Sequence, residues 1–571
     1  MDFECLAVIF ERLETVSSGN TIRDLLAEFL KTVAQEDLVN VCYLLLGRIS
    51  SDFDDTVLGI AEKSVLKSIA LASGMEITKI TAMVRETGDA GIAAQKVLQK
   101  KPRTLVPLKP LTVHDLVGKM HILAASTGSG SHDAKVTQLA TLLQRASPMG
   151  ARYVTRIALG TLRLGAGYKA LLDALAIAFT GDKKNKVILE QAYNICPDVG
   201  IIAETLMTKG LKGIEAIDIQ VGRPIQMMLC QRVEVLDEIP DKIPGEVTVE
   251  AKYDGERIQA HKNKKGKITL FSRCLDVITD QFPDVVKALA KQIDAEEFVV
   301  EGEVIAIDEK GNHLPFQLLM QRRRKYDVEE YVAKIPVQIK LFDVLYYNGK
   351  SFLHEAYVKR SALLEKIVHK NKAVTLTERI VTEDVMEMSD FFQKMLKEGY
   401  EGIIIKSRAS DSVYQAGVRG WNWIKWKKDY ETSLADTFDL VIIGAYSGRG
   451  KRQGVYGALL CAVYNNKSDT FESFCKLGTG LTDEVLEQLP VLLKKYQREK
   501  CPARVIVKKE MEPEVWFEPV IVVEVLGAEI TQSPFHAVGL ALRFPRFIRF
   551  RDDKKPEQAT TRREVEQMLR K

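Results

Sequence analysis

Apolar residues in the first third of the chain recur at the spacing of an α-helix. Positions three or four apart lie on one face of a helix, so each group forms an apolar stripe that needs a partner to pack against. The first two groups are Leu6, Ile9, Phe10 and Leu13, and Leu25, Leu26, Phe29 and Leu30. The pattern predicts an all-α region over residues 1–218.

Near Val221 the pattern changes to short apolar runs separated by turns and a few helices. This change predicts an α+β region over residues 219–432. A third region, 433–571, opens with two apolar runs, 440–446 and 456–464, on either side of a loop rich in glycine and basic residues. Two strands joined in this way are typical of the first hairpin of an OB-fold, so we expect a β-barrel here.

Composition adds three limits. A length of 571 residues predicts three or four domains, and a net charge of only +4 means that any nucleic-acid contact must come from local basic clusters. The eight cysteines include no Cys-x-x-Cys pair, which argues against a zinc ribbon or a disulfide framework. The acidic start lacks a signal peptide and no long apolar run occurs, so we expect an intracellular protein without a membrane partner.

The most informative segment is the octapeptide from Glu250 to Arg257, which places Lys252 at a strand edge. A lysine attacks phosphorus only as the neutral amine, and an ordinary pKa near 10.4 leaves about one molecule in 2,500 neutral at pH 7. Positive charge from Arg257 could lower that pKa, with Asp254 and Glu256 orienting the cations. An exposed hairpin with an Asp-Gly turn explains the octapeptide equally well when it is taken alone.

The octapeptide resembles the Lys-x-Asp-Gly-x-Arg motif of ATP-dependent DNA ligases and mRNA capping enzymes. Further segments match that family in order: Phe271-Ser-Arg273, Val300-Glu-Gly-Glu303, Lys340-Leu-Phe-Asp343, Glu401-Gly-Ile-Ile-Ile-Lys406, Trp423-Ile-Lys-Trp-Lys427 and the stretch Arg543–Lys554. The Arg-Phe-Pro-Arg-Phe-Ile-Arg part of the last stretch is similar to archaeal and eukaryotic replicative ligases in particular. The resemblance covers essentially the whole chain.

That resemblance implies an all-α DNA-binding domain (1–218), an α+β nucleotidyltransferase domain with an ATP-grasp-like adenylation fold (219–432) and a β-barrel OB-fold domain (433–571). It implies an ATP-dependent DNA ligase that seals nicks in double-stranded DNA during replication, repair and recombination. Lys252 would attack the ATP α-phosphate, AMP would pass to a DNA 5′-phosphate, and a 3′-hydroxyl would displace AMP. Such in-line displacements need alignment and charge neutralisation more than proton transfer.

Roles in the nucleotide site follow from the same resemblance. Glu250 would read the adenine amino edge, Phe342 would stack on the base unless it is only a core aromatic, and Glu303 would bond the ribose. Three arginines would contact the sugar and phosphates: Arg257, Arg273 and Arg419. Strand alternation is expected to put Lys425 and Lys427 on one face, where they grip the α-phosphate, and the tryptophans on the other. An exposed basic strand is the alternative.

The expected cofactors are ATP and Mg²⁺, with Glu303 and Glu401 as the acids that support the metal. The resemblance assigns Arg551, Asp553 and Lys554 to orienting the pyrophosphate in the first step. A P-loop is excluded, because Val344 stands where the upstream glycine before Gly349-Lys-Ser351 should be. The lack of a four-cysteine module argues against the NAD-dependent ligases.

Two sets of basic residues are candidates for contacting DNA phosphates. Arg152, Arg156 and Arg163 stand four and seven residues apart and are expected to share a helix face near the loop Gly128–Ser131. Arg449 and Lys451 suit a DNA backbone in the C-terminal loop. Helix-cap and salt-bridge roles, or a solvated hairpin, are the alternatives.

Nicked duplex DNA is thus the expected partner of a monomeric enzyme. Related ligases also bind a sliding clamp near a loop like Lys100–Pro110, but the expected pair of aromatic residues is missing there. Two other functions share features of the chain: an RNA ligase or capping guanylyltransferase, and a non-catalytic DNA clamp. The long helical region argues against the first, and the intact Lys252 argues against the second.

Overall fold

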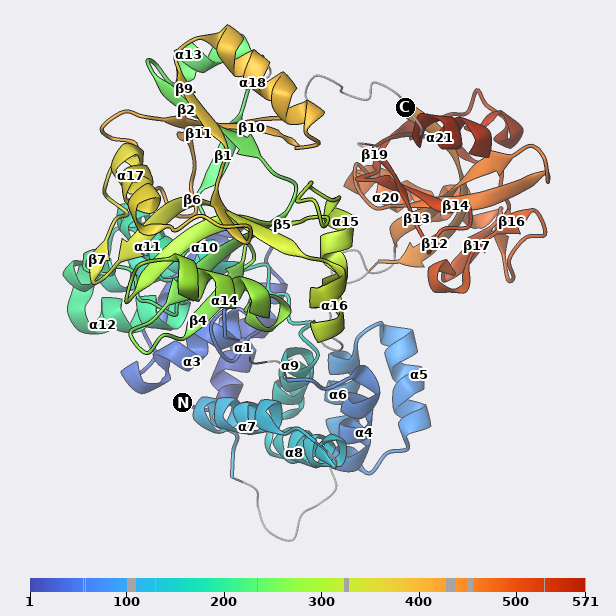
Figure 1. The fold of residues 1–571 in the computed structure, drawn as a ribbon. Coiled ribbons are helices and arrows are strands. Elements are labelled where there is room, and N and C mark those ends of the chain that lie inside the picture. Colours follow the sequence, from blue (N-terminus) through green and yellow to red (C-terminus); the bar gives the residue numbers. More distant parts are fainter. Residues whose placement is uncertain are drawn as a thin grey trace. The chain divides into compact units, whose positions relative to one another are not determined.

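The computed structural model of the protein describes residues 1–54, 56, 58–99, 109–128, 130–233, 235–322, 328–427, 437–448, 455–527 and 529–569 (Figure 1). The chain forms two compact units, Met1–Lys427 and Lys428–Lys571. The first unit holds both the helical region and a mixed α/β region, so the three domain bounds given above remain a prediction.

The N-terminal region is helical, as the apolar periodicity predicts. Leu6, Phe10 and Leu13 are fully buried, whereas Leu25 packs only partly against the core. Side-chain caps begin several helices; Ser147 accepts from the amide of Gly150 ahead of α9. The helices are α1 (Phe3–Glu14), α2 (Gly19–Leu30), α3 (Gln35–Leu45), α4 (Glu62–Ser73), α5 (Ile77–Thr87), α6 (Ala90–Leu98), α7 (Val113–Ala125), α8 (Ser131–Arg145), α9 (Pro148–Ala158), α10 (Tyr168–Thr180), α11 (Lys186–Ile195) and α12 (Val199–Glu215).

The rest of the first unit is built on two sheets. One has the order β1-β11-β10-β2-β9, and the other has the order β4-β3-β5-β6-β7 with β8 paired to β6. The strands of the first sheet are β1 (Leu229–Arg232), β2 (Val247–Lys252), β9 (Arg379–Thr382), β10 (Gly402–Ser407) and β11 (Arg419–Lys427). Those of the second are β3 (Glu256–Lys262), β4 (Ile268–Ser272), β5 (Phe298–Ala306), β6 (Val337–Tyr347), β7 (Lys350–Ser351) and β8 (Val374–Leu376).

Helices cover these sheets, and a shared apolar cluster joins the two. It includes Met228, Val299 and Trp423, which come from both sheets and from the segment leading into β1. The helices are α13 (Ile239–Lys242), α14 (Pro283–Gln292), α15 (Phe316–Leu319), α16 (Val328–Lys334), α17 (Tyr357–Ile367) and α18 (Val385–Lys397). This arrangement brings motif segments that are distant in sequence to one place.

The octapeptide is not a hairpin. β2 ends at Lys252 and pairs with β10 and β9, whereas β3 begins at Glu256 and pairs with β4 and β5. The three residues between them carry the chain from one sheet to the other. Gly255 is required at this crossing, because a Cβ there would lie 2.3 Å from the carbonyl oxygen of Val304.

The C-terminal unit is a β-barrel-like sheet in which β12 and β13 pair antiparallel, as the two apolar runs predict. The strand order is β15-β17-β12-β13-β14-β16, with β18 joining β12 to β21. The elements are β12 (Thr437–Ser447), β13 (Tyr456–Asn465), β14 (Thr470–Leu477), α20 (Asp483–Lys494), β15 (Gln497–Arg498), β16 (Val505–Ile506), β17 (Val515–Phe517), β18 (Val522–Leu526), β19 (Glu529–Gln532), β20 (Leu540–Arg543), β21 (Arg546–Phe550) and α21 (Arg562–Leu569). The predicted fold class is therefore confirmed as a helical N-terminal region, a mixed α/β region and a C-terminal OB-like half-barrel.

Across the described residues, no helix is long and apolar enough to cross a bilayer. The cysteines that the structure describes are all free thiols, which agrees with the lack of a disulfide framework in the sequence.

Gly402 provides a test of the sheet geometry. It has a φ of +150°, and a Cβ there would lie 2.1 Å from the carbonyl oxygen of Trp426 on β11. We expect Gly402→Ala to lower the free energy of unfolding by at least about 2 kcal/mol, through backbone strain and lost pairing. Gly118→Ala is the control, because that exposed position in α7 has no atom within 4 Å of the added methyl group. Equal denaturant midpoints for the two variants would show that a Cβ at position 402 does not strain the pairing of β10 with β11.

Candidate active site

The residues predicted for the nucleotide site surround one cavity of about 450 Å³ in the first unit. Its lining includes Glu250, Lys252, Arg257, Arg273, Glu303, Phe342, Glu401, Arg419, Lys425 and Lys427. They come from β2, β3, β5, β6 and β11, from the turn after β4 and from the residue before β10. A cavity of this size, with polar groups converging from several strands, suits a bound small molecule.

Lys252 lies at the end of β2 and is held by Glu401, the residue just before β10. Its Nζ pairs with one carboxylate oxygen of Glu401, and Lys427 pairs with the other. The amide of Glu401 also donates to the carbonyl oxygen of Lys252, at 2.9 Å. The carboxylate of Glu401 thus holds two ammonium groups at the cavity.

Lys425 of β11 has a lowered pKa in this site. Burial lowers the pKa of Lys425, and the positive charges of Lys252, Arg419 and Arg273 lower it further. The sequence argument assigned the neighbouring positive charge to Arg257. The structure adds Lys425, Arg419 and Arg273, from β11 and the turn after β4, to the cations that line the same cavity as Lys252 and Arg257.

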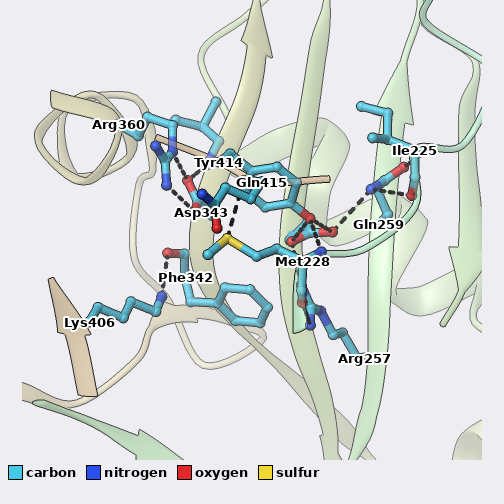
Figure 2. Close-up of polar contacts among 12 residues, drawn as sticks. Ile225, Met228, Arg257, Gln259, Phe342, Asp343, Arg360, Lys406, Tyr414 and Gln415 are labelled. Atoms are coloured by element: carbon cyan, nitrogen blue, oxygen red, sulfur yellow. Dashed lines mark hydrogen bonds and ion pairs between the residues drawn. The ribbon is translucent and has the colours of Figure 1, made fainter. Parts of the chain in front are cut away.

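Arg257 is turned toward the protein interior. Its NH2 group donates to Glu301 at 2.8 Å and its NH1 group donates to the carbonyl oxygen of Met228 at 2.8 Å (Figure 2). Burial acts to lower the pKa of Arg257, but the charge and hydrogen bond of Glu301, together with Tyr414 and Cys230, outweigh it and keep that pKa above its ordinary value. Because two of its nitrogens are committed inward, Arg257 has less freedom to contact a sugar or phosphate than the sequence indicated.

Phe342 and Glu250 both line the cavity. The Phe342 ring meets Trp423 edge to face, with centroids 6.2 Å apart, and the Arg257 guanidinium lies 5.3 Å from its centroid. Glu250 is 2% exposed and accepts from Tyr357 and from Lys406. Phe342 therefore combines a packing role with a place on the cavity wall.

The prediction that both tryptophans lie on the strand face opposite the two lysines is wrong for one of them. Trp423 has the same strand parity as Lys425 and Lys427, and it lines the cavity with them. Trp426 has the opposite parity and packs against Phe392 of α18. Only Trp426 lies on the face away from the two lysines.

Two acids in the cavity are candidates for supporting a metal. Burial raises the pKa of Glu303 to about 7, against the lowering effect of the Lys252 and Arg257 charges. No group of three or more His, Cys, Asp or Glu that could hold a metal occurs within the part of the chain that the structure describes. Two carboxylates are as many as Mg²⁺ usually takes from a protein, since it fills its other positions with water and phosphate oxygens.

The arginines assigned to DNA do not share one helix face. α9 ends at Ala158, so Arg163 lies beyond the helix. Arg156 is 8% exposed and pairs with Glu14 and Asp89, and Arg152 also pairs with Glu14. These ion pairs favour the salt-bridge alternative for Arg152 and Arg156. Arg449, Lys451, most of the loop Lys100–Pro110 and Ser129 of the loop Gly128–Ser131 lie outside the described residues.

The three C-terminal candidates form a cluster around Asp439 of β12. Arg551 donates to one carboxylate oxygen of Asp439 at 2.8 Å, and Lys554 pairs with the other. Arg551 also forms a two-bond contact with Asp553. This cluster is an ordered structure and not a tail of separately solvated charges.

Sequence reasoning missed several residues around the cavity. Lys406 belongs to a quoted motif but received no role, and Glu301 was passed over in favour of Glu303. Tyr357 and Tyr414 lie in no motif and carry no local signal of their contacts. Strand parity could have identified Glu301 as a residue facing the same side as Glu303.

Three family profiles match the chain: "DNA ligase N terminus" over residues 2–176, "ATP dependent DNA ligase domain" over 227–427 and "ATP dependent DNA ligase C terminal region" over 452–554. The chain is 43% identical to "DNA ligase 1" of Methanosarcina acetivorans, over 99% of this chain and 98% of that protein. It is 41% identical to "DNA ligase" of Saccharolobus solfataricus, over 100% of this chain and 98% of that protein. A solved structure titled "Pmar-Lig_PreS3" has a similar fold, with a TM-score of 0.55 and 17% identity over 95% of this chain and 99% of its own.

A buried histidine behind the cavity predicts a pH dependence of stability. His261 of β3 accepts from the amide of Gly222 and contacts Gln259, and burial lowers its pKa to about 3. The unfolded chain, with an ordinary pKa near 6.5, therefore binds more protons between these values, so stability is full above pH 6.5 and falls as the pH drops. We expect a loss of about 1 kcal/mol between pH 7 and pH 5.5 in denaturant unfolding.

His261→Gln removes the titrating group and should flatten this pH dependence. His121→Gln is the matched control, because His121 is exposed on α7 and its loss should leave the slope unchanged. An identical slope in His261→Gln and the unmodified protein would show that His261 does not cause it.

Proposed function

The chain belongs to the ATP-dependent DNA ligases, and we propose that Lys252 carries the reaction through a lysine–AMP intermediate. The protein is thus an ATP-dependent DNA ligase that seals nicks in DNA. The observation that best supports Lys252 as the nucleophile is its place on a cavity wall that it shares with eight other motif residues and Arg419.

In the first step the Lys252 amine attacks the α-phosphate of ATP, a phosphoramidate bond forms and pyrophosphate leaves. The amine must first lose its proton and separate from Glu401, its partner in the structure. In the second step a DNA 5′-phosphate oxygen attacks the lysine-bound AMP and releases the lysine. In the third, the 3′-hydroxyl attacks the adenylated phosphate, closes the backbone and releases AMP.

We propose that Glu250 accepts from the 6-amino group of adenine and that Phe342 stacks on the base. Glu303 bonds the ribose, and Arg257, Arg273 and Arg419 contact the sugar and phosphates, Arg257 with the reduced freedom described above. Lys425 and Lys427 grip the α-phosphate. Their shared cavity and the high density of fixed cations support these roles, since phosphoryl transfer depends on preorganised charge.

Mg²⁺ is the proposed metal, with Glu303 and Glu401 as its supporting acids. Bound there, the ion would neutralise phosphate charge and align the transferring group. Glu401 is occupied by Lys252 and Lys427 in the structure, so its carboxylate must exchange partners before it can support a cation.

We also propose the domain bounds 1–218, 219–432 and 433–571, with the helical domain and the loop containing Arg449 and Lys451 contacting duplex DNA. Arg163, which lies beyond α9, is a better phosphate ligand than Arg152 and Arg156, whose charges are already paired. Four further points stay predictions from the resemblance. They are work in replication, repair and recombination, an intracellular location, a monomeric state, and a sliding clamp as a second partner.

The catalytic role of Lys252 has a direct test. We expect Lys252→Ala and Lys252→Arg to form no adenylate, because neither a methyl group nor a guanidinium can act as the neutral amine. The mass of the protein after incubation with ATP and Mg²⁺ is the measurement, and the unmodified chain should gain one AMP. Lys264→Arg, an exposed lysine on the same unit, is the control. One added AMP on either Lys252 variant would exclude this lysine, and labelling by GTP alone would favour a capping guanylyltransferase.

Variants of the C-terminal cluster around Asp439 should affect the first reaction step and not the last. We expect Arg551→Ala and Lys554→Ala to lose self-adenylation by at least about tenfold, because fixed cations that orient pyrophosphate are removed. Sealing of a nick that already carries AMP should persist, since that step releases no pyrophosphate. Lys467→Ala, an exposed lysine of the same unit, should change neither assay. Equal losses in both assays would instead indicate a DNA contact or misfolding.

A further inference from the structure

We propose that Lys406 and Tyr357 are positioning residues that set the choice of nucleobase, by holding the carboxylate of Glu250 as a fixed acceptor for a 6-aminopurine. This inference rests on the proposed role of Glu250 at the adenine edge. None of the roles argued above depends on Lys406 or Tyr357.

Both oxygens of Glu250 are occupied from the protein side. The phenol of Tyr357 donates to Oε1 at 2.5 Å, and the ammonium of Lys406 pairs with Oε2 at 2.8 Å. Glu250 and Lys406 are 2% and 1% exposed. Because an ionised carboxylate offers about four lone-pair sites, the two donors leave acceptor positions that can face a ligand.

Lys406 is enclosed in a way that makes it dependent on Glu250. Its Nζ lies 4.5 Å from the ring centroid of Trp423, 4.8 Å from that of Phe342 and 4.9 Å from that of Tyr357. It also donates to the carbonyl oxygen of Phe342 at 3.3 Å (Figure 2). A buried ammonium and a buried carboxylate each offset the desolvation cost of the other, so each depends on its partner.

Tyr357 is fixed as a donor by its surroundings. Burial raises the pKa of Tyr357 well above its ordinary value, and the charge of Glu250 raises it further, so the phenol keeps its proton. Its helix, α17, is tied to β6 by a fully buried pair in which Arg360 donates to both oxygens of Asp343, at 2.8 and 3.0 Å. The amide of Tyr357 also donates to the carbonyl oxygen of Ser412 at 2.8 Å.

These contacts leave Glu250 able only to accept from a base. The 6-amino group of adenine donates a hydrogen bond, whereas the 6-oxo group of hypoxanthine or guanine would place a second acceptor against the carboxylate. A site built around a fixed hydrogen-bond acceptor opposite position 6 disfavours a base that has no donor at that position. Without the Lys406 ammonium, the buried Glu250 carboxylate would lose the donor on Oε2 and would no longer be held as a fixed acceptor.

The experiment compares self-nucleotidylation by ATP and by inosine triphosphate, which carries a 6-oxo group in place of the 6-amino group. We expect the unmodified protein to favour ATP. The preference for ATP is the kcat/KM for ATP divided by the kcat/KM for inosine triphosphate. Lys406→Met should reduce this ratio by about 10- to 100-fold, mainly through KM, because the fixed acceptor is lost. Tyr357→Phe removes one hydroxyl and should reduce the same ratio by a smaller factor, and Lys406→Arg should retain more of it than Lys406→Met.

Lys262→Met is the matched control. Lys262 is a half-buried lysine of β3 whose Nζ donates to a backbone carbonyl and lies 5.9 Å from the ring centroid of Phe298, but it does not line the cavity. Its loss should leave the ratio unchanged.

The outcomes separate this inference from the proposed function. If the unmodified protein uses both nucleotides equally, the adenine-reading role of Glu250 is wrong and the inference falls with it. If the unmodified protein favours ATP, and both Tyr357→Phe and Lys406→Met keep its full preference for ATP over inosine triphosphate, the inference is overturned while the role of Glu250 stands. Should Lys406→Met fail to fold, as judged by its thermal midpoint, Tyr357→Phe and Lys406→Arg decide the question.

Discussion

The buried carboxylate of Glu301 is the contact on which the nucleotide cavity depends. It is fully buried on β5 and accepts from Arg257 at 2.8 Å, from Gln259 at 3.0 Å and from Tyr414 at 3.0 Å (Figure 2). Tyr414 and Arg257 in turn bind the amide and the carbonyl oxygen of Met228. One charge thus joins strands of the second sheet to the segment that enters the first. Removing a partner from such a buried network costs roughly 3–5 kcal/mol, because the remaining charge is left without compensation.

Packing around this network explains why the nucleophile stands where two sheets meet. β2 delivers Lys252, and the chain then crosses to β3 through a turn that only glycine permits at position 255. The cavity therefore has walls from both sheets, and its polar groups are set by strand register more than by loops. Side chains on regular strands hold catalytic geometry more precisely than side chains on loops do.

The sequence was sufficient for the motifs and for the helical periodicity, because both are local patterns with a direct physical meaning. It could not show that Arg156 would meet Glu14 and Asp89, since those pairs join residues 142 and 67 positions apart. The hairpin reading of the octapeptide failed for the same reason, as β2 and β3 find their partners elsewhere in the chain. Lys406 and Tyr357 became visible only when their distances to Glu250 were known.

The double ion pair of Glu401 with Lys252 and Lys427 has a consequence for nucleotide affinity. Two cations of the site already have a protein counter-ion, so a polyphosphate that binds there replaces the Glu401 carboxylate as their partner instead of binding to unpaired cations. Binding by ion exchange within a protein releases fewer dissolved counter-ions than binding to unpaired lysines. Affinity for the nucleotide should then vary only weakly with ionic strength, whereas affinity for the DNA backbone keeps the steep salt dependence of polyelectrolyte binding.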